Sequence, residues 1–322
     1  MGRPSAVPCG LGREWLQIHS RCGWSEVCAR VYIEAVLLQA RQRSARRCVR
    51  RSFRPVGRSS LSGLLRRCAV QHSFAGGAGG TPTIKAGGLT MQVAVITPYY
   101  RESVELLQIC HDSVAAQGHS CRHVLVADGF PQDSLDDWPV DHVRLPEPHH
   151  DIGSTPRLIG AVHAVGLGAD LICFLDADNW YAVDHVASVV ACIAETGAAF
   201  VSCGRHLHDL DGRYLAECPN IDPEHFVDTN CMAFARPAFG LLSQWVLMPP
   251  YAHLIGDRVM LHHIRHSGLP CQHLSRPSVH YRCGKAGIYR QLGLPLPSGV
   301  SAPPDYASSF RQWVADGNPP LQ

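Results

Sequence analysis

From Met91 onward, short runs of apolar residues alternate with longer stretches in which apolar residues recur every three or four positions. Three of the runs lie within 93–97, 123–127 and 171–175, and their length is typical of strands buried on both faces. The longer stretches between them have the periodicity of amphipathic helices. This alternation predicts an α/β fold with a mostly parallel sheet that helices cover on both faces.

A small hydroxyl residue before a proline marks the start of one helix. Thr155 precedes Pro156, so we predict a helix with Thr155 as N-cap and Pro156 at its first position, where the missing N–H costs nothing. The other predicted elements are a helix ending near Gly118, an edge strand 140–145, a helix 183–195 closed by Gly197, a strand 200–203, a hairpin at Asp211-Gly212, a strand 226–235 and a helix 256–266.

Residues 1–90 differ in composition from the remainder. They contain 15 Lys and Arg, three Glu and no Asp, whereas residues 91–322 contain 14 basic and 24 acidic residues. We therefore expect a disordered basic extension followed by one domain over 91–322. The extension could be a transit peptide, a basic arm for nucleic acid or an anionic membrane, or sequence upstream of a true start at Met91. The third interpretation is favoured because Met91 opens directly onto the first strand, and it leaves no nucleic-acid partner to expect.

The spacing of the cysteines and the length of the apolar segments limit the classes of protein to which this chain can belong. The 14 cysteines include no C-x-x-C pair, so the sequence gives no support to a zinc ribbon or a thioredoxin-type site. Several stand inside apolar runs, where cysteine behaves as a small core residue, so we expect reduced thiols and a cytoplasmic protein. No apolar segment approaches the roughly 18–20 residues of a membrane span. Peripheral association with the inner face of a membrane stays open.

Two carboxylates one residue apart follow the most apolar strand. Asp176 and Asp178 stand in Phe-Leu-Asp-Ala-Asp-Asn, and alternate residues of an extended chain point to the same side. Paired carboxylates repel each other unless they share a cation, and oxygen ligands select Mg²⁺ or Mn²⁺. The pair therefore predicts a metal site, with capping of the next helix as the alternative.

From Met91 to about Gln291 the chain resembles the family-2 glycosyltransferases of GT-A fold. The segments that carry the resemblance are Thr97-Pro98-Tyr99-Tyr100-Arg101-Glu102, Val126-Ala127-Asp128-Gly129, Gly153-Ser154-Thr155-Pro156-Arg157, Asp176-Ala177-Asp178 and Ile255-Gly256-Asp257-Arg258. The chain departs from the family where Ala127 and Gly256 replace the first of two consecutive acids. It also lacks the Gln-x-x-Arg-Trp signature of processive members, which argues against a polymer synthase.

The resemblance implies a role for each matching residue. Asp257 would be the general base, and Asp228 and Asn230 would lie on the acceptor or donor-sugar side. The implied ligands of Mn²⁺ or Mg²⁺ are Asp176, Asp178 and His280. The residues implied to bind the nucleotide-sugar are Pro98, Tyr99, Glu102, Asp128, Gly153, Arg157, Asp176, Arg282 and Lys285.

Ordinary structural roles compete with several of these assignments. Arg157, in the first turn of a helix, suits a pyrophosphate but could be a solvated side chain. Asp128 could accept from a base N–H or form an Asx-turn with its own backbone. Asp257 could be a helix N-cap, and Asp228 is then the rival base. His280 could be an ordinary hydrogen-bonded histidine.

The sequence thus predicts metal-dependent transfer of a sugar from a nucleotide-sugar to an acceptor hydroxyl, with inversion. UDP is favoured as the nucleotide by the resemblance. One rival is a nucleotidyltransferase that makes nucleotide sugars, although the loop 98–102 lacks the glycines that grip a triphosphate. A second rival is a non-catalytic protein that binds nucleotide or sugar with the same fold.

Overall fold

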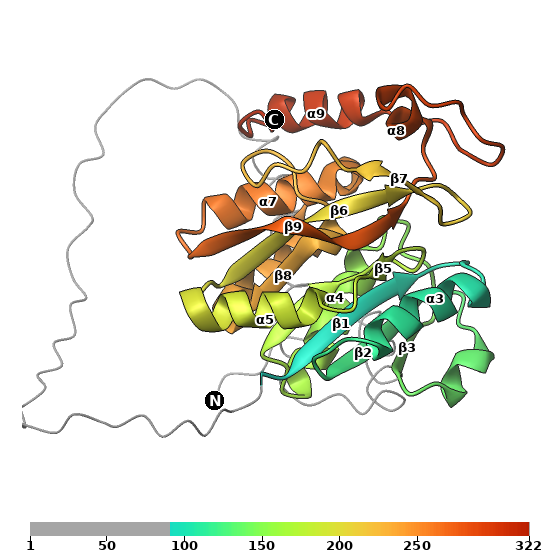
Figure 1. Ribbon diagram of the computed structural model, residues 1–322. Coiled ribbons are helices and arrows are strands. Elements are labelled where there is room, and N and C mark those ends of the chain that lie inside the picture. The colour runs from blue at the N-terminus through green and yellow to red at the C-terminus, as the bar shows by residue number, and fades with distance from the viewer. Residues whose placement is uncertain (1–90, 322) are drawn as a thin grey trace, which may run out of the picture. The chain divides into compact units, whose positions relative to one another are not determined.

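The computed structural model describes residues 91–321, which build one sheet flanked by helices (Figure 1). The predictions made for residues 1–90 lie outside the described residues. Four parallel strands in the order β3-β2-β1-β4 form the first half of the sheet. They are β1 (Val93–Tyr99), β2 (Cys121–Asp128), β3 (Asp141–Leu145) and β4 (Leu171–Phe174).

The second half of the sheet mixes parallel and antiparallel pairs. β8 (Met232–Ala235) runs antiparallel between β4 and β6 (Phe200–His208), and β9 (Cys271–Arg282) lies parallel to β6. The shorter strands β5 (Trp180–Tyr181) and β7 (Tyr214–Glu217) pair antiparallel with β9 and β6. The predicted α/β class is confirmed, and its longest parallel block is the half that contains β1 to β4.

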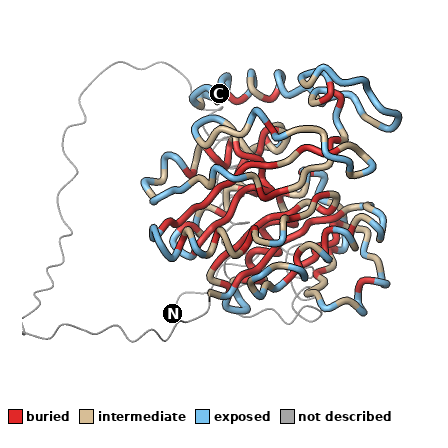
Figure 2. Tube along the Cα trace, in the orientation of Figure 1, coloured by how far each residue is buried: buried red, intermediate tan, exposed pale blue. Residues whose placement is uncertain are grey.

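Helices cover both faces of the parallel strands. α4 (Ser154–Gly166) packs on Ile96 and Val126, whereas Thr97, the next residue of β1, contacts α3 (Val104–Ala115). Figure 2 shows that most residues of the central strands are buried, whereas residues of the outer loops are exposed. No helix within 91–321 is long and apolar enough to cross a bilayer. The other helices are α5 (His185–Thr196), α6 (Gln244–Leu247), α7 (Gly256–Arg265), α8 (Ala286–Gln291) and α9 (Tyr306–Ala315), with 3₁₀ turns η1 (Asp133–Asp137), η2 (Thr229–Cys231), η3 (Arg236–Ser243) and η4 (Pro250–Ile255).

Two predicted boundaries are wrong. The helix predicted to start with Thr155 as N-cap has Gly153 there, because the Asp151 carboxylate accepts from both the N–H and the hydroxyl of Thr155 inside the first turn. The strand predicted over 226–235 begins only at β8, because the Asp228 side chain caps the preceding turn η2. The remaining predicted helices and strands are present, with ends shifted by a few residues.

Gly160→Ala is expected to lower the free energy of unfolding by roughly 1–3 kcal/mol. A Cβ at Gly160 would lie 2.5 Å from Ile96 Cγ2 and 2.8 Å from Val126 Cγ2, so α4 would have to move away from the sheet. Gly240→Ala is the matched control, since nothing lies within 4 Å of a Cβ added there. Urea midpoints that agree between the two variants would contradict the close approach of α4.

Candidate functional site

The carboxyl ends of β1, β2 and β4 open into a hollow of about 610 Å³. These strands are parallel neighbours, so the residues that follow them meet at one edge of the sheet, where ligands bind in open α/β folds. The structure brings together most residues with a predicted donor or metal role. Those in the lining are Pro98, Tyr99, Glu102, Asp128, Gly153, Arg157, Asp176, Asp178 and Lys285.

Asp176 is held by hydrogen bonds on both carboxylate oxygens. Oδ1 accepts from Arg157 Nη2 at 2.5 Å, and Oδ2 accepts from Asn230 Nδ2 at 3.0 Å. The backbone N–H of Asp176 donates to Asn230 Oδ1. Arg157 is 7% exposed and also donates from Nη1 to the Ile152 carbonyl at 2.8 Å. Arg157 is therefore a fixed cation in the first turn of α4, which itself favours anions.

Asp178 has a carboxylate that accepts no hydrogen bond from another residue in the described part of the chain. Burial raises its pKa to about 7, and the charges of Asp176 and Glu102 contribute to the rise. A divalent cation would relieve both causes. Within 91–321 no group of three or more His, Cys, Asp or Glu side chains could hold a metal by itself. Asp178 thus has the chemistry to hold a hard cation such as Mg²⁺ or Mn²⁺, whose remaining ligands would have to come from groups other than these side chains.

Asp128, at the end of β2, tethers the loop that follows β3. Its Oδ1 accepts from His149 Nδ1 at 2.7 Å and from the His149 N–H at 3.1 Å, and this pairing raises the pKa of His149. The alternative of an Asx-turn with its own backbone is not what the structure shows. Beyond His149 the backbone is left-handed at His150, Ile152 and Gly153, with φ of 54°, 58° and 78°. A left-handed backbone is strained at a β-branched residue such as Ile152, and strained residues of this kind are found most often at ligand-binding sites.

His280 points away from the hollow, although we predicted it as a metal ligand. Tyr281 lines the hollow, and successive side chains of a strand face opposite sides of the sheet. His280 Nδ1 lies 2.9 Å from His208 Nε2, and its ring stacks on that of Trp180. Burial, together with the neighbouring histidines, lowers its pKa to about 4. The structure therefore does not bring His280 and Asp178 together.

Arg282 supports the Asp-Ala-Asp segment and is not part of the lining. Its Nε donates to the Asp178 carbonyl at 3.2 Å, and its backbone N–H donates to Asn179 Oδ1 at 2.8 Å. Lys285, the other late cation predicted to bind the nucleotide-sugar, does line the hollow, with Nζ 2.9 Å from Ser301 Oγ. Of the two, Lys285 is the one placed to meet a phosphate.

Asp257, the predicted general base, is not in the lining of the hollow but lies beside Asp228 in the first turn of α7. The N-cap of α7 is Ile255, so the N-cap alternative does not hold. Burial raises the pKa of Asp257 to about 6, and the Asp228 charge adds to the rise. Asp228 has both carboxylate oxygens occupied, Oδ2 by Arg205 and Oδ1 by Asn230. Asp257 Oδ1 accepts from the Arg258 N–H at 2.8 Å, which leaves its Oδ2 as the oxygen that could accept a proton.

Comparison with known proteins relates part of the chain to one family. Residues 94–232, from β1 to the start of β8, match the model of glycosyl transferase family 2. Over this segment the chain is similar to family-2 glycosyltransferases, and its sheet and helices are consistent with the GT-A fold. No curated protein matches its sequence. It is similar to the solved structure of S. aureus TarS 1-349 in complex with UDP, with 14% identity, a TM-score of 0.48 and 63% of each chain covered. For S. aureus TarS 1-349 in complex with UDP-GlcNAc the identity is 13% and the TM-score 0.45, covering 70% of this chain and 66% of that chain.

Several residues that line the hollow were not predicted to take part in a site. The Tyr100 ring packs edge-on against the Phe130 ring, with 4.8 Å between the ring centroids, and against the His150 ring, with 6.2 Å between the centroids. Tyr100 is adjacent to predicted residues, a signal that sequence reasoning could have used. The positions of His150 and Tyr281 depend on the fold of a long loop and on strand register, which no local pattern encodes. The complete set without a prediction is Tyr100, His150, Ile152, Pro156, Ala177 and Tyr281.

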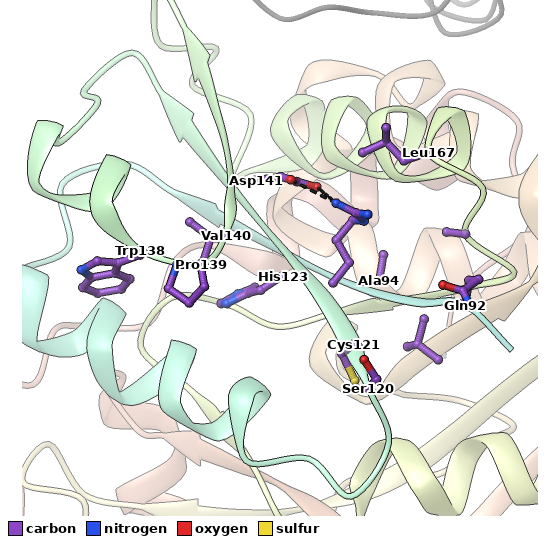
Figure 3. A pocket seen from close by; sticks show the side chains of 13 residues that line it. Gln92, Ala94, Ser120, Cys121, His123, Trp138, Pro139, Val140, Asp141 and Leu167 are labelled. Atoms are coloured by element: carbon purple, nitrogen blue, oxygen red, sulfur yellow. Dashed lines mark hydrogen bonds and ion pairs between the residues drawn. The ribbon is translucent and has the colours of Figure 1, made fainter. Parts of the chain in front are cut away.

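A second hollow, of about 400 Å³, opens at the amino ends of β1 and β2 (Figure 3). Arg122 Nη1 and Asp141 Oδ2 form an ion pair there at 2.9 Å, and His123 Nε2 lies 3.0 Å from Thr97 Oγ1. These polar groups are already paired with one another. The first hollow, at the carboxyl ends of the strands where ligands bind in open α/β folds, is therefore the candidate site.

Proposed function

We propose that this glycosyltransferase moves a sugar from a nucleotide-sugar, with a UDP-sugar favoured, to an acceptor hydroxyl in a metal-dependent, inverting reaction. The observation that carries the proposal is the Asp178 carboxylate, which lines the hollow, accepts no hydrogen bond from another residue within 91–321 and has its pKa raised to about 7. It stands next to the Asp176–Arg157 pair, a fixed cation at a helix N-terminus. A divalent cation would complement the charge of Asp178, and a diphosphate would complement the charge of Arg157.

The described residues divide the reaction between them. Asp178 would hold Mn²⁺ or Mg²⁺, which when bound takes up charge on the departing diphosphate. Arg157 and Lys285 bind the phosphates, and Asp128 accepts from the base. Asp257 removes the proton of the acceptor hydroxyl, which attacks the anomeric carbon opposite the leaving group and inverts it.

The nucleotidyltransferase rival is disfavoured by the loop after β1. Glu102 Oε2 accepts from the N–H groups of Tyr100 and Arg101, so the amides that would grip a triphosphate are already used. The non-catalytic rival gives no reason for a half-buried carboxylate at Asp178 that accepts no hydrogen bond from another described residue, an arrangement that is costly unless a ligand requires it. The acceptor, the cytoplasmic location and a peripheral membrane association stay predictions.

Calorimetric titration of the full chain with UDP and with GDP, in Mn²⁺ and then in EDTA, tests this function. We expect one of the two nucleotides to bind with a Kd of about 10 μM in Mn²⁺ and to give no heat in EDTA. Asp211→Asn, in the exposed turn between β6 and β7, is the control and should bind like wild type. Absence of nucleotide binding in every condition would contradict the donor site.

A further inference from the structure

Arg205 of β6 is a buried cation next to the donor hollow that has no part in the reaction described above. It is 5% exposed, and its guanidinium forms an ion pair with Asp228. Its Nε–H donates to Cys218 Sγ at 3.4 Å, and its Cζ lies 4.0 Å from the centre of the Tyr281 ring. Tyr281 itself lines the hollow. Three contacts therefore hold the guanidinium in one orientation beside the site.

The backbone of β6 is irregular immediately before Arg205. The pairing of β6 with β9 changes register between Cys203 and Arg205, and a Cβ added to Gly204 would lie 3.2 Å from Pro277 Cγ of β9. Such irregularities re-aim side chains and are over-represented next to active sites. The change of register sets the direction in which Arg205 leaves the strand.

Asn230 joins Asp228 to Asp176 through a single amide group. Its Nδ2 donates to Asp228 Oδ1 at 2.7 Å and to Asp176 Oδ2 at 3.0 Å, which uses both amide hydrogens. Its Oδ1 accepts from the Asp176 N–H. The amide can make this set of bonds in only one orientation, since a flipped amide would place its oxygen against two carboxylates. Its orientation therefore depends on where the Asp228 carboxylate is held.

We propose that Arg205 is a positioning residue, which acts through Asp228 and Asn230 to fix Asp176 at the donor site. A buried ion pair is a poor source of stability compared with apolar side chains of the same size. The Arg205–Asp228 pair does, however, set the geometry of a hydrogen-bonded chain that ends on the Asp-Ala-Asp segment. This inference rests on the proposed function, because Asp176 matters only if the hollow binds the metal and nucleotide.

A double-mutant cycle in metal-dependent UDP binding tests the inference. The full chain, Arg205→Gln, Asn230→Ala and the double variant are titrated with UDP in Mn²⁺ by calorimetry. We expect each single variant to raise the Kd about tenfold, as loss of residues that orient metal ligands does. The double variant should bind no more weakly than either single variant, because both changes break one chain of contacts. Arg236→Gln, which breaks the partly exposed pair with Asp170, is the matched control and should leave the Kd unchanged.

Arg205→Lys keeps the test open if Arg205→Gln does not fold, because lysine retains the charge opposite Asp228. A lysine lacks the planar fork, so we expect a Kd raised about threefold, and no rise when Asn230→Ala is already present. Folded Arg205 variants that bind UDP as wild type does would overturn the inference, as would effects that multiply in the double variant. A wild type that binds neither UDP nor GDP would overturn the proposed function and, with it, this inference; if only GDP binds, the same cycle is measured with GDP. Wild-type binding that the Arg205 variants leave unchanged would overturn the inference alone.

Discussion

Asp178→Asn is expected to abolish metal-dependent UDP binding and to lower kcat about a thousandfold, while making the metal-free protein more stable. Activity falls because asparagine offers no charge to a divalent cation. Stability rises because the carboxylate it replaces is ionised in the unfolded chain above pH 3.8 but in the folded chain only above about pH 7. Wild type therefore loses stability as the pH rises from about 4 to 7, and the variant does not.

The size of the stability effect can be bounded and measured. The pKa shift of Asp178 corresponds to roughly 1–3 kcal/mol after allowance for its partial exposure. Urea unfolding in EDTA at pH 5 and pH 8 should show a gap between Asp178→Asn and wild type that widens at the higher pH. A variant that is less stable at pH 8, or that keeps Mn²⁺-dependent UDP binding, would refute the assignment of this carboxylate to the cation.

Asp257→Asn should lower kcat by about 10²- to 10⁴-fold and leave the Kd for UDP within a factor of two. The carboxylate is not in the lining of the donor hollow, so its loss removes proton transfer and not nucleotide binding. Its pKa is raised to about 6, so wild-type kcat should fall as the pH drops below 6 and the base becomes protonated. The variant should lack this acidic limb.

A pH profile of kcat, with Asp184→Asn as the control, distinguishes Asp257 from its rival. Asp184 is paired with Arg276 at the surface, so its variant should keep the wild-type profile. If Asp257→Asn kept a near-normal kcat, the assignment of Asp257 would be wrong and another group would have to be the general base. Asp228 is the weaker choice for that group, because Arg205 and Asn230 already occupy its oxygens.

The parts of the fold that could be predicted are those in which local sequence and final environment agree. β1, β2 and β4 are buried along nearly their whole length, so their apolar runs predict them directly. The start of α4 was misplaced because the cap depends on the side chain of Asp151, which precedes the Thr155-Pro156 signal. Competing side-chain bonds of this kind are not visible in hydrophobic periodicity.

Site residues that directly follow parallel strands could be predicted from the sequence. Site residues whose side of the sheet depends on strand register could not. Asp128 and Asp178 converge because the strands before them, β2 and β4, both pair in parallel with β1. His280 was misplaced because, in β9, Tyr281 is the residue that faces the hollow, and an assignment one residue out reverses the face. Arg205 had no sequence signal, since its partner Asp228 is brought to it by a turn and a change of strand register.

Because of the position of β8, the segment that matches the family model is shorter than the segment that must be present for the sheet to fold. β8 lies between β4 and β6, although it follows β6 in the chain. Phe174 at the end of β4 packs against Phe234 of β8 and Trp245 of α6, and both lie beyond residue 232, where the family match ends. A fragment cut at that boundary would keep one residue of β8, leaving Phe174 in water and the edge of β4 open to other chains. Truncations, fusions and module exchanges in this protein should therefore keep the chain at least through β9, which pairs with both β6 and β5.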